Sequence, residues 1–316
     1  MKSLIIIVFL FTTVFASKFH IPIASFEASG GVTDMLLVDD KLYVSTDASC
    51  VDVFDFKTRR IIQKIKLDKI KDFTGEEIDD KIFSVDVIEN KVLILAEGMQ
   101  GYNRIYIYEN GKKNLLISDG DSLSIIKAKF LDKNTILLAL LSDEIISYDI
   151  SKKKINYRVQ ASESKFSDFA LNKKRTKIVV ADESGDLQLL RTKDGSLIKS
   201  FTGENLDNVF QVDYKNGIIA TAGKDRRMVI YNTNLNQTYY KTSLFFIYSV
   251  GLSPSGKLVA YSSDINNNIT VFNTITKNRV GKFGSNKVTI SKILFLNEKE
   301  FLVSNVGNVI NLYKVR

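Results

Sequence analysis

The sequence feature that most constrains the fold is a short pattern that recurs about every 41 residues. In each copy an apolar run ends in an aromatic or large apolar residue, usually followed by a polar one. The copies are Val53-Phe54-Asp55, Ile107-Tyr108-Glu109, Ser147-Tyr148-Asp149, Leu189-Leu190-Arg191, Ile230-Tyr231-Asn232, Val271-Phe272-Asn273 and Leu312-Tyr313-Lys314. The intervals between them are 54, 40, 42, 41, 41 and 41 residues. Because four strand-like runs fit in each period, the pattern indicates the blades of a β-propeller.

The two ends of the chain predict how the ring closes. The seventh unit has only three strand-like runs, Ile290 to Leu296, Glu300 to Ser304 and Val309 to Tyr313, whereas an unassigned run extends from Phe19 to Phe26. Placing the latter outermost in the last blade covers a sheet edge that would otherwise be exposed. We therefore expect an all-β fold, a seven-bladed propeller of four-stranded antiparallel blades closed by the N-terminal strand. A ring of six or eight four-stranded blades would not account for all the predicted strands without a remainder.

The sixth unit carries a family signature. Ser249 to Asp264 reads SVGLSPSGKLVAYSSD and is followed by ITVFN from Ile269 to Asn273. This segment resembles the WD-repeat consensus. The chain has no Trp, and no Gly-His pair opens a unit, so we expect the His–Asp hydrogen-bond network of typical WD repeats to be missing. The resemblance implies a degenerate, bacterial type of propeller.

The first sixteen residues have the features of an export signal. Lys2 supplies a positive charge, an apolar run extends from Leu4 to Phe15, and small residues precede a cleavage point after Ala16. We expect a signal peptide at residues 1–16, one domain at residues 17–316 and a periplasmic location. The alternative is an uncleaved anchor, but a membrane span needs about 20 apolar residues, and the polar residues from Ser17 onward cut this run short.

Composition limits the chemistry that the chain can perform. Its one histidine, His20, lies in the proposed closing strand, where we expect a partly exposed strand residue, so no Ser/His/Asp or Cys/His mechanism can be built elsewhere in the chain. With one cysteine, Cys50, and one histidine, the chain also lacks the residues for a histidine-rich metal site or an intrachain disulfide. The acidic pairs Glu76-Glu77 and Asp79-Asp80 lack the spacing of a calcium loop, and we expect them to be solvated rather than catalytic or metal-binding. We expect no enzymatic activity, no metal and no cofactor.

The formal net charge is +8, or +7 once Lys2 is removed with the signal. The basic residues are spread over strand ends and turns rather than clustered, which predicts solvation rather than nucleic-acid binding. We expect a monomer that is not inserted in a membrane after cleavage.

The inner strands share a polar position. Counted from the first apolar residue of each, the third residue is polar, namely Asp34, Ser84, Lys127, Asp168, Gln211, Ser249 and Lys292. Strand alternation predicts that this ring surrounds the upper mouth of the central channel. It is either the wall that a water-filled channel requires or a recognition ring for a ligand.

The long first interval predicts an interaction face. Residues 68–81 exceed the other connections by about a dozen residues, and the turn at residues 97–104 is also enlarged; extra loop on a repeat scaffold commonly gathers on the binding face. Aromatic, Met and Arg side chains are enriched in interfaces. We expect a partner to bind Phe73, Met99, Tyr102, Arg104, Lys224, Asp225, Arg226, Phe246 and Tyr248. The alternative is a pair of tolerated, mobile insertions.

An exported, single-domain, degenerate propeller rich in Lys, Ile and Asn resembles the L-type accessory proteins of periplasmic nitrate reductase systems. The resemblance covers the whole mature chain and implies a non-enzymatic scaffold that assists assembly of the molybdenum-containing reductase without binding its cofactor. One alternative is a binding module for outer-membrane or other envelope assembly. Another is a hydrolase or lactonase propeller, which would need carboxylates converging on the channel mouth.

Overall fold

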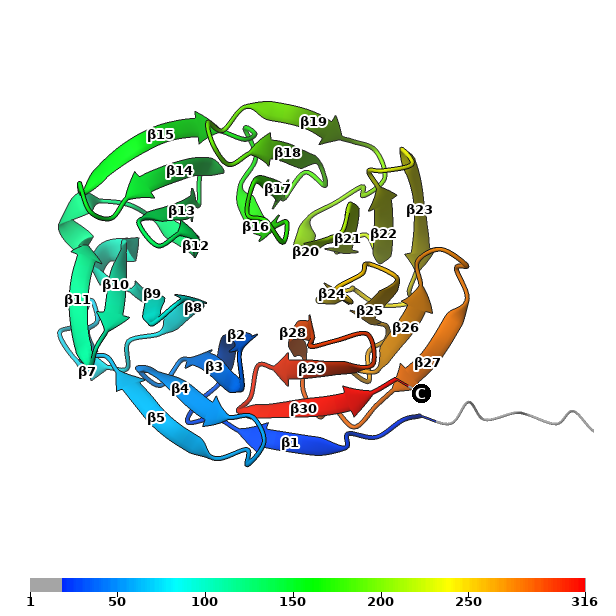
Figure 1. Cartoon of the computed structure of the whole chain (residues 1–316), viewed down its shortest axis with the longest axis horizontal. Coiled ribbons are helices and arrows are strands. Elements are labelled where there is room, and N and C mark those ends of the chain that lie inside the picture. The colour runs from blue at the N-terminus through cyan, green and yellow to red at the C-terminus, as the bar shows by residue number, and fades with distance from the viewer. Residues whose placement is uncertain (1–18, 316) are drawn as a thin grey trace, which may run out of the picture.

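Seven four-stranded antiparallel sheets surround a central channel in the computed structural model, which describes residues 19–315 (Figure 1). The predicted fold class is confirmed. The expected signal peptide and its cleavage point lie outside the described residues.

In each blade the first strand lines the channel and the fourth lies at the outer rim (Figure 1). Blade one contains β2 (Val32–Val38), β3 (Lys41–Thr46), β4 (Cys50–Asp55) and β5 (Ile61–Lys66), and blade two contains β8 (Ile82–Ile88), β9 (Lys91–Glu97), β10 (Asn103–Glu109) and β11 (Lys112–Ile117). Blade three contains β12 (Ile125–Asp132), β13 (Thr135–Leu140), β14 (Glu144–Asp149) and β15 (Lys154–Gln160), and blade four contains β16 (Phe166–Leu171), β17 (Lys177–Asp182), β18 (Leu187–Arg191) and β19 (Leu197–Phe201). Blade five contains β20 (Val209–Lys215), β21 (Ile218–Gly223), β22 (Arg227–Asn232) and β23 (Gln237–Thr242), and blade six contains β24 (Val250–Leu252), β25 (Leu258–Ser262), β26 (Ile269–Asn273) and β27 (Arg279–Phe283). Blade seven contains β28 (Ile290–Phe295), β29 (Glu300–Asn305), β30 (Val309–Lys314) and, from the other end of the chain, β1 (Ala24–Glu27).

The N-terminal strand closes the ring as predicted. β1 pairs antiparallel with β30, with Ala24 opposite Leu312 and Glu27 opposite Val309. The predicted strand from Phe19 to Phe26 is too long, however, because Pro22 has no amide hydrogen for a sheet ladder. On its N-terminal side, His20 instead forms a parallel bridge with Phe283 of blade six. The closing segment therefore contacts two blades.

The apolar core is divided into seven clusters, one at each interface between neighbouring blades. The cluster between blades seven and one includes Phe26, which is 2% exposed. Its ring packs edge-on against Phe54 at 5.6 Å and stacks on Phe56 at 5.5 Å. Burying one such side chain contributes about 2–3 kcal/mol, so the closing strand adds both backbone pairing and core packing.

The polar residue of the recurring pattern caps the turn that follows the third strand. The carboxylate of Asp55 accepts the amide of Thr58 at 2.7 Å, and that of Asp149 accepts Lys152 at 2.8 Å. The side chain of Asn273 accepts Ile275 and Thr276 at 2.9 Å. These are turns of the Asx type, which explains why Asp or Asn so often follows the aromatic residue.

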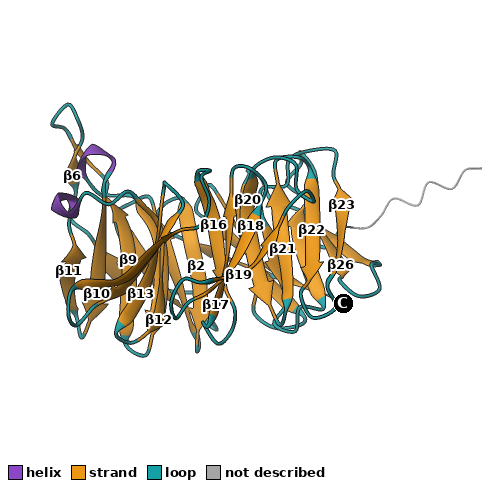
Figure 2. Cartoon of the chain, turned by 90° about the horizontal axis from the view of Figure 1, so that it is seen from above, coloured by secondary structure: helices purple, strands orange, loops and turns teal. Residues whose placement is uncertain are grey.

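Because the strands are antiparallel, the connections fall on two opposite faces of the disc (Figure 2). The upper face carries the blade-to-blade connections and the turns between second and third strands, and the lower face carries the remaining turns. The long insertion forms a small hairpin on the upper face, β6 (Ile70–Lys71) with β7 (Glu77–Ile78). Two 3-10 helices, η1 (Met99–Gly101) and η2 (Asp119–Asp121), lie on the same side (Figure 2).

Candidate functional site

Exposed apolar side chains are concentrated on the upper face. Of the 21 large hydrophobic residues that are exposed among residues 19–315, ten lie in upper-face connections and two in lower-face turns. The ten, which we call the apolar patch, are Phe73, Ile78, Met99, Leu141, Leu206, Leu244, Phe246, Ile265, Val288 and Val306. Three of them were predicted from the sequence as interface residues, namely Phe73, Met99 and Phe246. The ten side chains come from connections around the whole ring and share one face of the disc, and exposed apolar surface that is gathered on one face is a candidate docking surface.

The insertion between blades one and two presents the most exposed aromatic side chain. Phe73 is fully exposed at the tip of the β6–β7 hairpin. The hairpin is organised by Asp72, whose Oδ1 accepts the amides of Thr74 at 2.8 Å and Glu76 at 3.0 Å. Met99, which is 50% exposed, lies in η1 on the same side of the disc (Figure 2). Tyr102, just after η1, is only half-buried. The insertion is thus ordered by its own hydrogen bonds.

Arg104 was predicted as a partner contact, but its side chain is committed within the fold. Its Nη2 donates to the buried carboxylate of Asp80 at 2.7 Å and its Nε donates to the carbonyl of Glu97 at 3.0 Å. Asp119 of η2 lies 3.7 Å from the same guanidinium. Burial still raises the pKa of Asp80 to about 7, against the lowering effect of Arg104. We therefore assign Arg104 to anchoring the insertion.

Replacing Arg104 with Ala is expected to lower the free energy of unfolding by about 3 kcal/mol, because removing one partner leaves a buried carboxylate uncompensated. The additional change Asp80→Asn should recover much of the loss at pH 8. Urea unfolding of the two variants and the parent measures both effects. An Arg104→Ala protein as stable as the parent would contradict the anchoring role.

A second group of aromatic side chains lies at the junction of blades five and six. Phe245 lies 5.4 Å from Phe246 and 6.1 Å from Tyr248, measured between ring centroids, and Tyr248 stacks on Phe210 at 5.3 Å. Phe210 also lines the channel. Beside this cluster, Leu244 is 95% exposed. The group therefore extends from the channel wall to the upper surface.

The predicted polar members of the face have different environments. Asp225 accepts the amides of Leu206 at 2.8 Å and Arg227 at 2.9 Å, so it shapes the loop. Lys224 is exposed and pairs with Asp207 at 3.3 Å, and Arg226 is exposed. Of the three, Lys224 and Arg226 are accessible to a partner.

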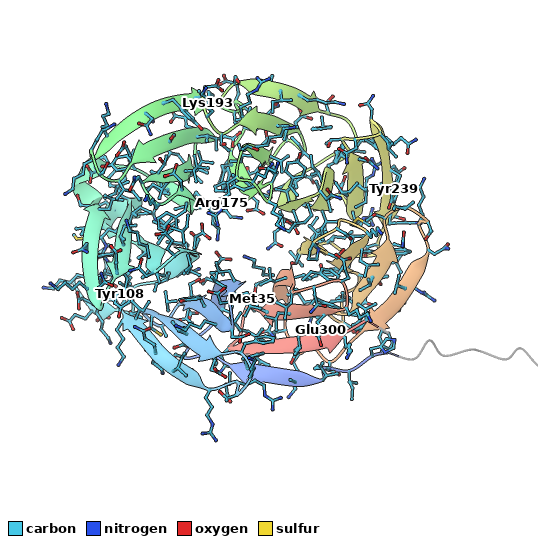
Figure 3. The ribbon with its side chains drawn as sticks, viewed as in Figure 1. Met35, Tyr108, Arg175, Lys193, Tyr239 and Glu300 are labelled. Carbon is cyan, nitrogen blue, oxygen red and sulfur yellow. The ribbon has the colours of Figure 1, made fainter. Side chains whose placement is uncertain are left out.

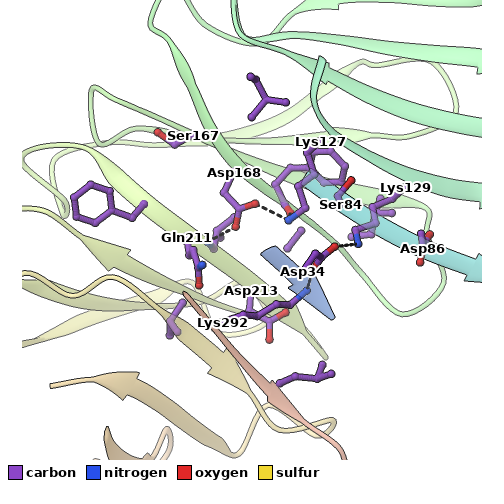
Figure 4. Close-up of a pocket in the computed structure, with 18 of the residues that line it drawn as sticks. Asp34, Ser84, Asp86, Lys127, Lys129, Ser167, Asp168, Gln211, Asp213 and Lys292 are labelled. Carbon is purple, nitrogen blue, oxygen red and sulfur yellow. Dashed lines mark hydrogen bonds and ion pairs between the residues drawn. The ribbon is translucent and has the colours of Figure 1, made fainter. Parts of the chain in front are cut away.

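The four charged residues of the predicted polar ring form ion pairs inside the channel (Figure 4). Asp34 is at the centre: Lys129 binds its Oδ2 at 2.8 Å, and Lys292 binds its Oδ1. The two ammonium groups hold the pKa of Asp34 far below its ordinary value, against the effect of burial. Burial, together with the neighbouring lysines, lowers the pKa of Lys292. Positive charge therefore exceeds negative charge around Asp34.

The channel carboxylates also join neighbouring blades. Each accepts a backbone amide from the inner strand of the next blade: Asp34 from Val85 at 3.2 Å, Asp86 from Phe130 at 2.8 Å, Asp168 from Val212 at 3.0 Å and Asp213 from Leu252 at 2.9 Å. Three of them also bind a cation from a different blade, and Arg175 crosses from blade four to Asp86 of blade two at 2.6 Å. Each inner strand is the edge strand of its sheet and forms no backbone ladder with the next blade. The carboxylate–amide hydrogen bonds connect the blades there instead.

The remaining ring members make similar contacts. Lys127 donates to Asp168 at 2.5 Å and to the carbonyl of Phe169 at 2.9 Å. The amide of Ala128 donates to Oγ of Ser84 at 3.3 Å, and Oγ of Ser249 donates to Gln211 at 2.8 Å. All ring residues except Ser249 line a cavity of about 470 Å³ in the channel. The ring is thus both a wall and a joint between blades.

The other residues considered for chemistry are scattered. Glu76, Glu77 and Asp79 are exposed on the insertion, whereas Asp80 is buried under it. The ring of His20 in the closing segment packs in a tilted orientation against that of Phe283, with 4.9 Å between the ring centroids, and Cys50 is buried. Within residues 19–315, no three His, Cys, Asp or Glu side chains gather closely enough to hold a metal ion. In the same region, no helix has the length and apolar character that crossing a membrane requires.

The chain was compared with protein-family models and with known proteins. No protein-family model matches the chain. The chain is similar to dynein regulatory complex protein 1 of Xenopus laevis, with 24% identity over 185 residues. The aligned part is 52% of this chain and spans about a quarter (26%) of that protein.

Proposed function

We propose that this protein is a non-enzymatic scaffold that binds another protein with its upper face. The observation that carries the proposal is the apolar patch, in which ten exposed large hydrophobic side chains share one face with the ordered insertion. Removing such apolar surface from water favours association, and the two Phe side chains and the Met side chain of the patch are of types enriched in interfaces. The exposed Lys224 and Arg226 add polar contacts at the rim of the patch.

The channel supports a scaffold rather than a hydrolase. A propeller hydrolase would need carboxylates free to converge on a substrate or an ion. Here Asp34 and Asp168 each bind an ammonium group and a backbone amide, and Asp86 binds Arg175. The carboxylates therefore serve the joints between blades.

The proposal predicts that polar replacements on the upper face abolish partner binding. In the test variant, Phe73, Met99 and Leu244 are replaced with Ser, because hot-spot side chains each contribute about 2 kcal/mol or more. We expect the affinity for the co-purifying partner to fall by at least about 30-fold, as measured by pull-down and then by titration calorimetry.

A matched control carries the same number of apolar-to-Ser changes at the outer rim. Ile62, Leu115 and Leu197 are 54%, 48% and 57% exposed on fourth strands, and their replacement should leave binding unchanged. Both variants should melt close to the parent, because all six side chains are exposed. Equal binding by parent and upper-face variant would refute the proposal.

On the basis of the resemblance to the L-type accessory proteins, we propose a periplasmic nitrate reductase as the partner. It is tested by whether reductase subunits co-purify with the tagged protein and whether this depends on Phe73, Met99 and Leu244. Co-purification of outer-membrane assembly proteins instead would favour the alternative of an envelope assembly module. The periplasmic location is tested by fractionation and by N-terminal sequencing, which should begin at Ser17.

A further inference from the structure

The fold separates charge between its two faces. The upper-face connections contain seventeen acidic and seven basic residues, a surplus of ten negative charges, whereas the lower-face turns contain thirteen basic and five acidic residues, a surplus of eight positive charges. The prediction of dispersed basic residues is therefore wrong. It failed because upper and lower connections alternate along the chain, so the two charge signs are mixed in sequence and separated only in space.

Most of the lower-face surplus lies under blades three and four. Their four lower turns contain seven basic residues and one acidic residue, Asp194. Arg175 is at the channel, bound to Asp86, and Lys193 of the same blade is at the outer rim (Figure 3). The six exposed lysines, which we call the lysine patch, are Lys133, Lys152, Lys153, Lys173, Lys174 and Lys193.

The lysine patch is largely uncompensated. Within residues 19–315, Lys152 pairs with Asp149 at 3.6 Å, and the other five lysines make no ion pair. Exposed charges that lie within about 10 Å of one another repel at ordinary ionic strength. A surface of this kind attracts anions, because its six lysines outnumber the neighbouring carboxylates of Asp132, Asp149 and Asp194.

The shape of the lower face restricts the partner. Its turns are short, many of them two residues long, and its profile is even, whereas the upper face bears the projecting hairpin (Figure 2). Among the lower turns that the structure describes, two large hydrophobic side chains are exposed, and both are aliphatic: Leu235 at 64% and Ile275 at 67%, at the tips of turns in blades five and six. A flat basic surface with two exposed aliphatic side chains is complementary in shape and charge to a flat anionic surface.

Nucleic acid fits the lower face less well. Proteins that bind single strands present aromatic platforms for bases, and the described lower turns expose none. Readers of a duplex rely on Arg forks and on an element that enters a groove, but the exposed side chains of the patch are lysines on short turns. The lysine ammonium group acts as a point charge that does not require a fixed hydrogen-bond geometry. It can therefore interact with lipid headgroups that are free to move.

We propose that the lower face binds the surface of an anionic lipid bilayer. The lysine patch supplies the electrostatic attraction to phosphate headgroups, and Leu235 and Ile275 enter the headgroup layer. The protein then lies peripherally on the membrane, with the upper face turned toward the aqueous side. This proposal is independent of partner binding by the upper face.

The test is flotation of the purified protein with phosphatidylcholine vesicles, with and without phosphatidylglycerol. The parent should bind only the anionic vesicles and should be released when the salt concentration rises from about 0.1 M to about 1 M, which shortens the screening length from about 10 Å to about 3 Å. Each lysine near an anionic surface changes affinity about fivefold. Reversing Lys152, Lys153, Lys173 and Lys174 to Glu should therefore weaken binding by more than several hundredfold, because four positive charges are lost and four negative charges are added.

The matched control reverses four upper-face lysines, Lys69, Lys71, Lys165 and Lys287, which changes the net charge equally. It should bind anionic vesicles within a fewfold of the parent, and milder Lys→Gln changes in the patch should give an intermediate loss. Equal losses in both Glu variants would overturn the proposal, because net charge alone would then explain binding. Binding to duplex DNA without binding to vesicles would overturn it too. The lysine-patch variant should keep the upper-face partner.

Discussion

Replacing Phe26 with Ala is expected to lower the free energy of unfolding by about 3–5 kcal/mol, the usual cost of removing a buried Phe side chain. Phe26 is 2% exposed and fills the interface between blade seven and blade one. The loss would therefore act on the one interface that joins the two ends of the chain. Denaturant unfolding followed by circular dichroism measures the change.

Ile23 provides the control, because it is in the same closing segment but 54% exposed. Its replacement with Ala should change stability by no more than about 0.5 kcal/mol. A protein lacking residues 19–27 should also associate through the uncovered edge of β30. If Phe26→Ala and Ile23→Ala had equally small effects, the closing strand would not be a structural part of the ring.

Replacing Asp34 with Ala should lower the free energy of unfolding by about 3 kcal/mol, because it leaves two half-buried ammonium groups without their counter-ion. Lys129 and Lys292 both bind this carboxylate, which also accepts the amide of Val85 in the next blade. Asp34→Asn keeps the shape and removes the charge, so it separates electrostatics from packing. Asp40→Ala removes an exposed pair with Lys57 and should change stability by less than about 1 kcal/mol.

The Asp34 effect should depend on pH with a definite sign. Its folded-state pKa is depressed far below the unfolded value of about 3.9. A depressed carboxyl pKa contributes stability that is fully present above the unfolded value and is lost as pH falls toward the folded one. The stability difference between parent and Asp34→Asn should thus be constant from pH 5 to pH 8 and shrink below about pH 4. A difference that grew on acidification would contradict the ion-pair account.

The fold could be predicted because its information is local and repeated. The aromatic residue and the Asp or Asn after it recur since the same packing and the same capped turn recur in each blade, as at Asp55 and Asn273. Ring closure followed from counting strands. The exact length of the closing strand did not, because it depends on Pro22 and on a contact of His20 with a blade distant in sequence.

The site was less accessible to sequence reasoning. Leu244 begins an apolar run that leads into blade six, so no pattern distinguished its exposure from the burial of Ile247 three residues later. Arginine is common in protein interfaces, so the sequence favoured a partner contact for Arg104. Its role in anchoring the insertion is evident only from its hydrogen bond to the buried Asp80. The separation of charge between the faces depends on which turns share a side, which appears once the strands are paired.

Photo-crosslinking measures docking by the upper face most directly. A photoreactive residue placed at Phe73, Met99 or Leu244 should form a covalent adduct with the co-purifying partner. The same residue at Ile62, Leu115 or Leu197 on the outer rim should form none. Adducts from the rim positions, with none from the three upper-face positions, would contradict the account.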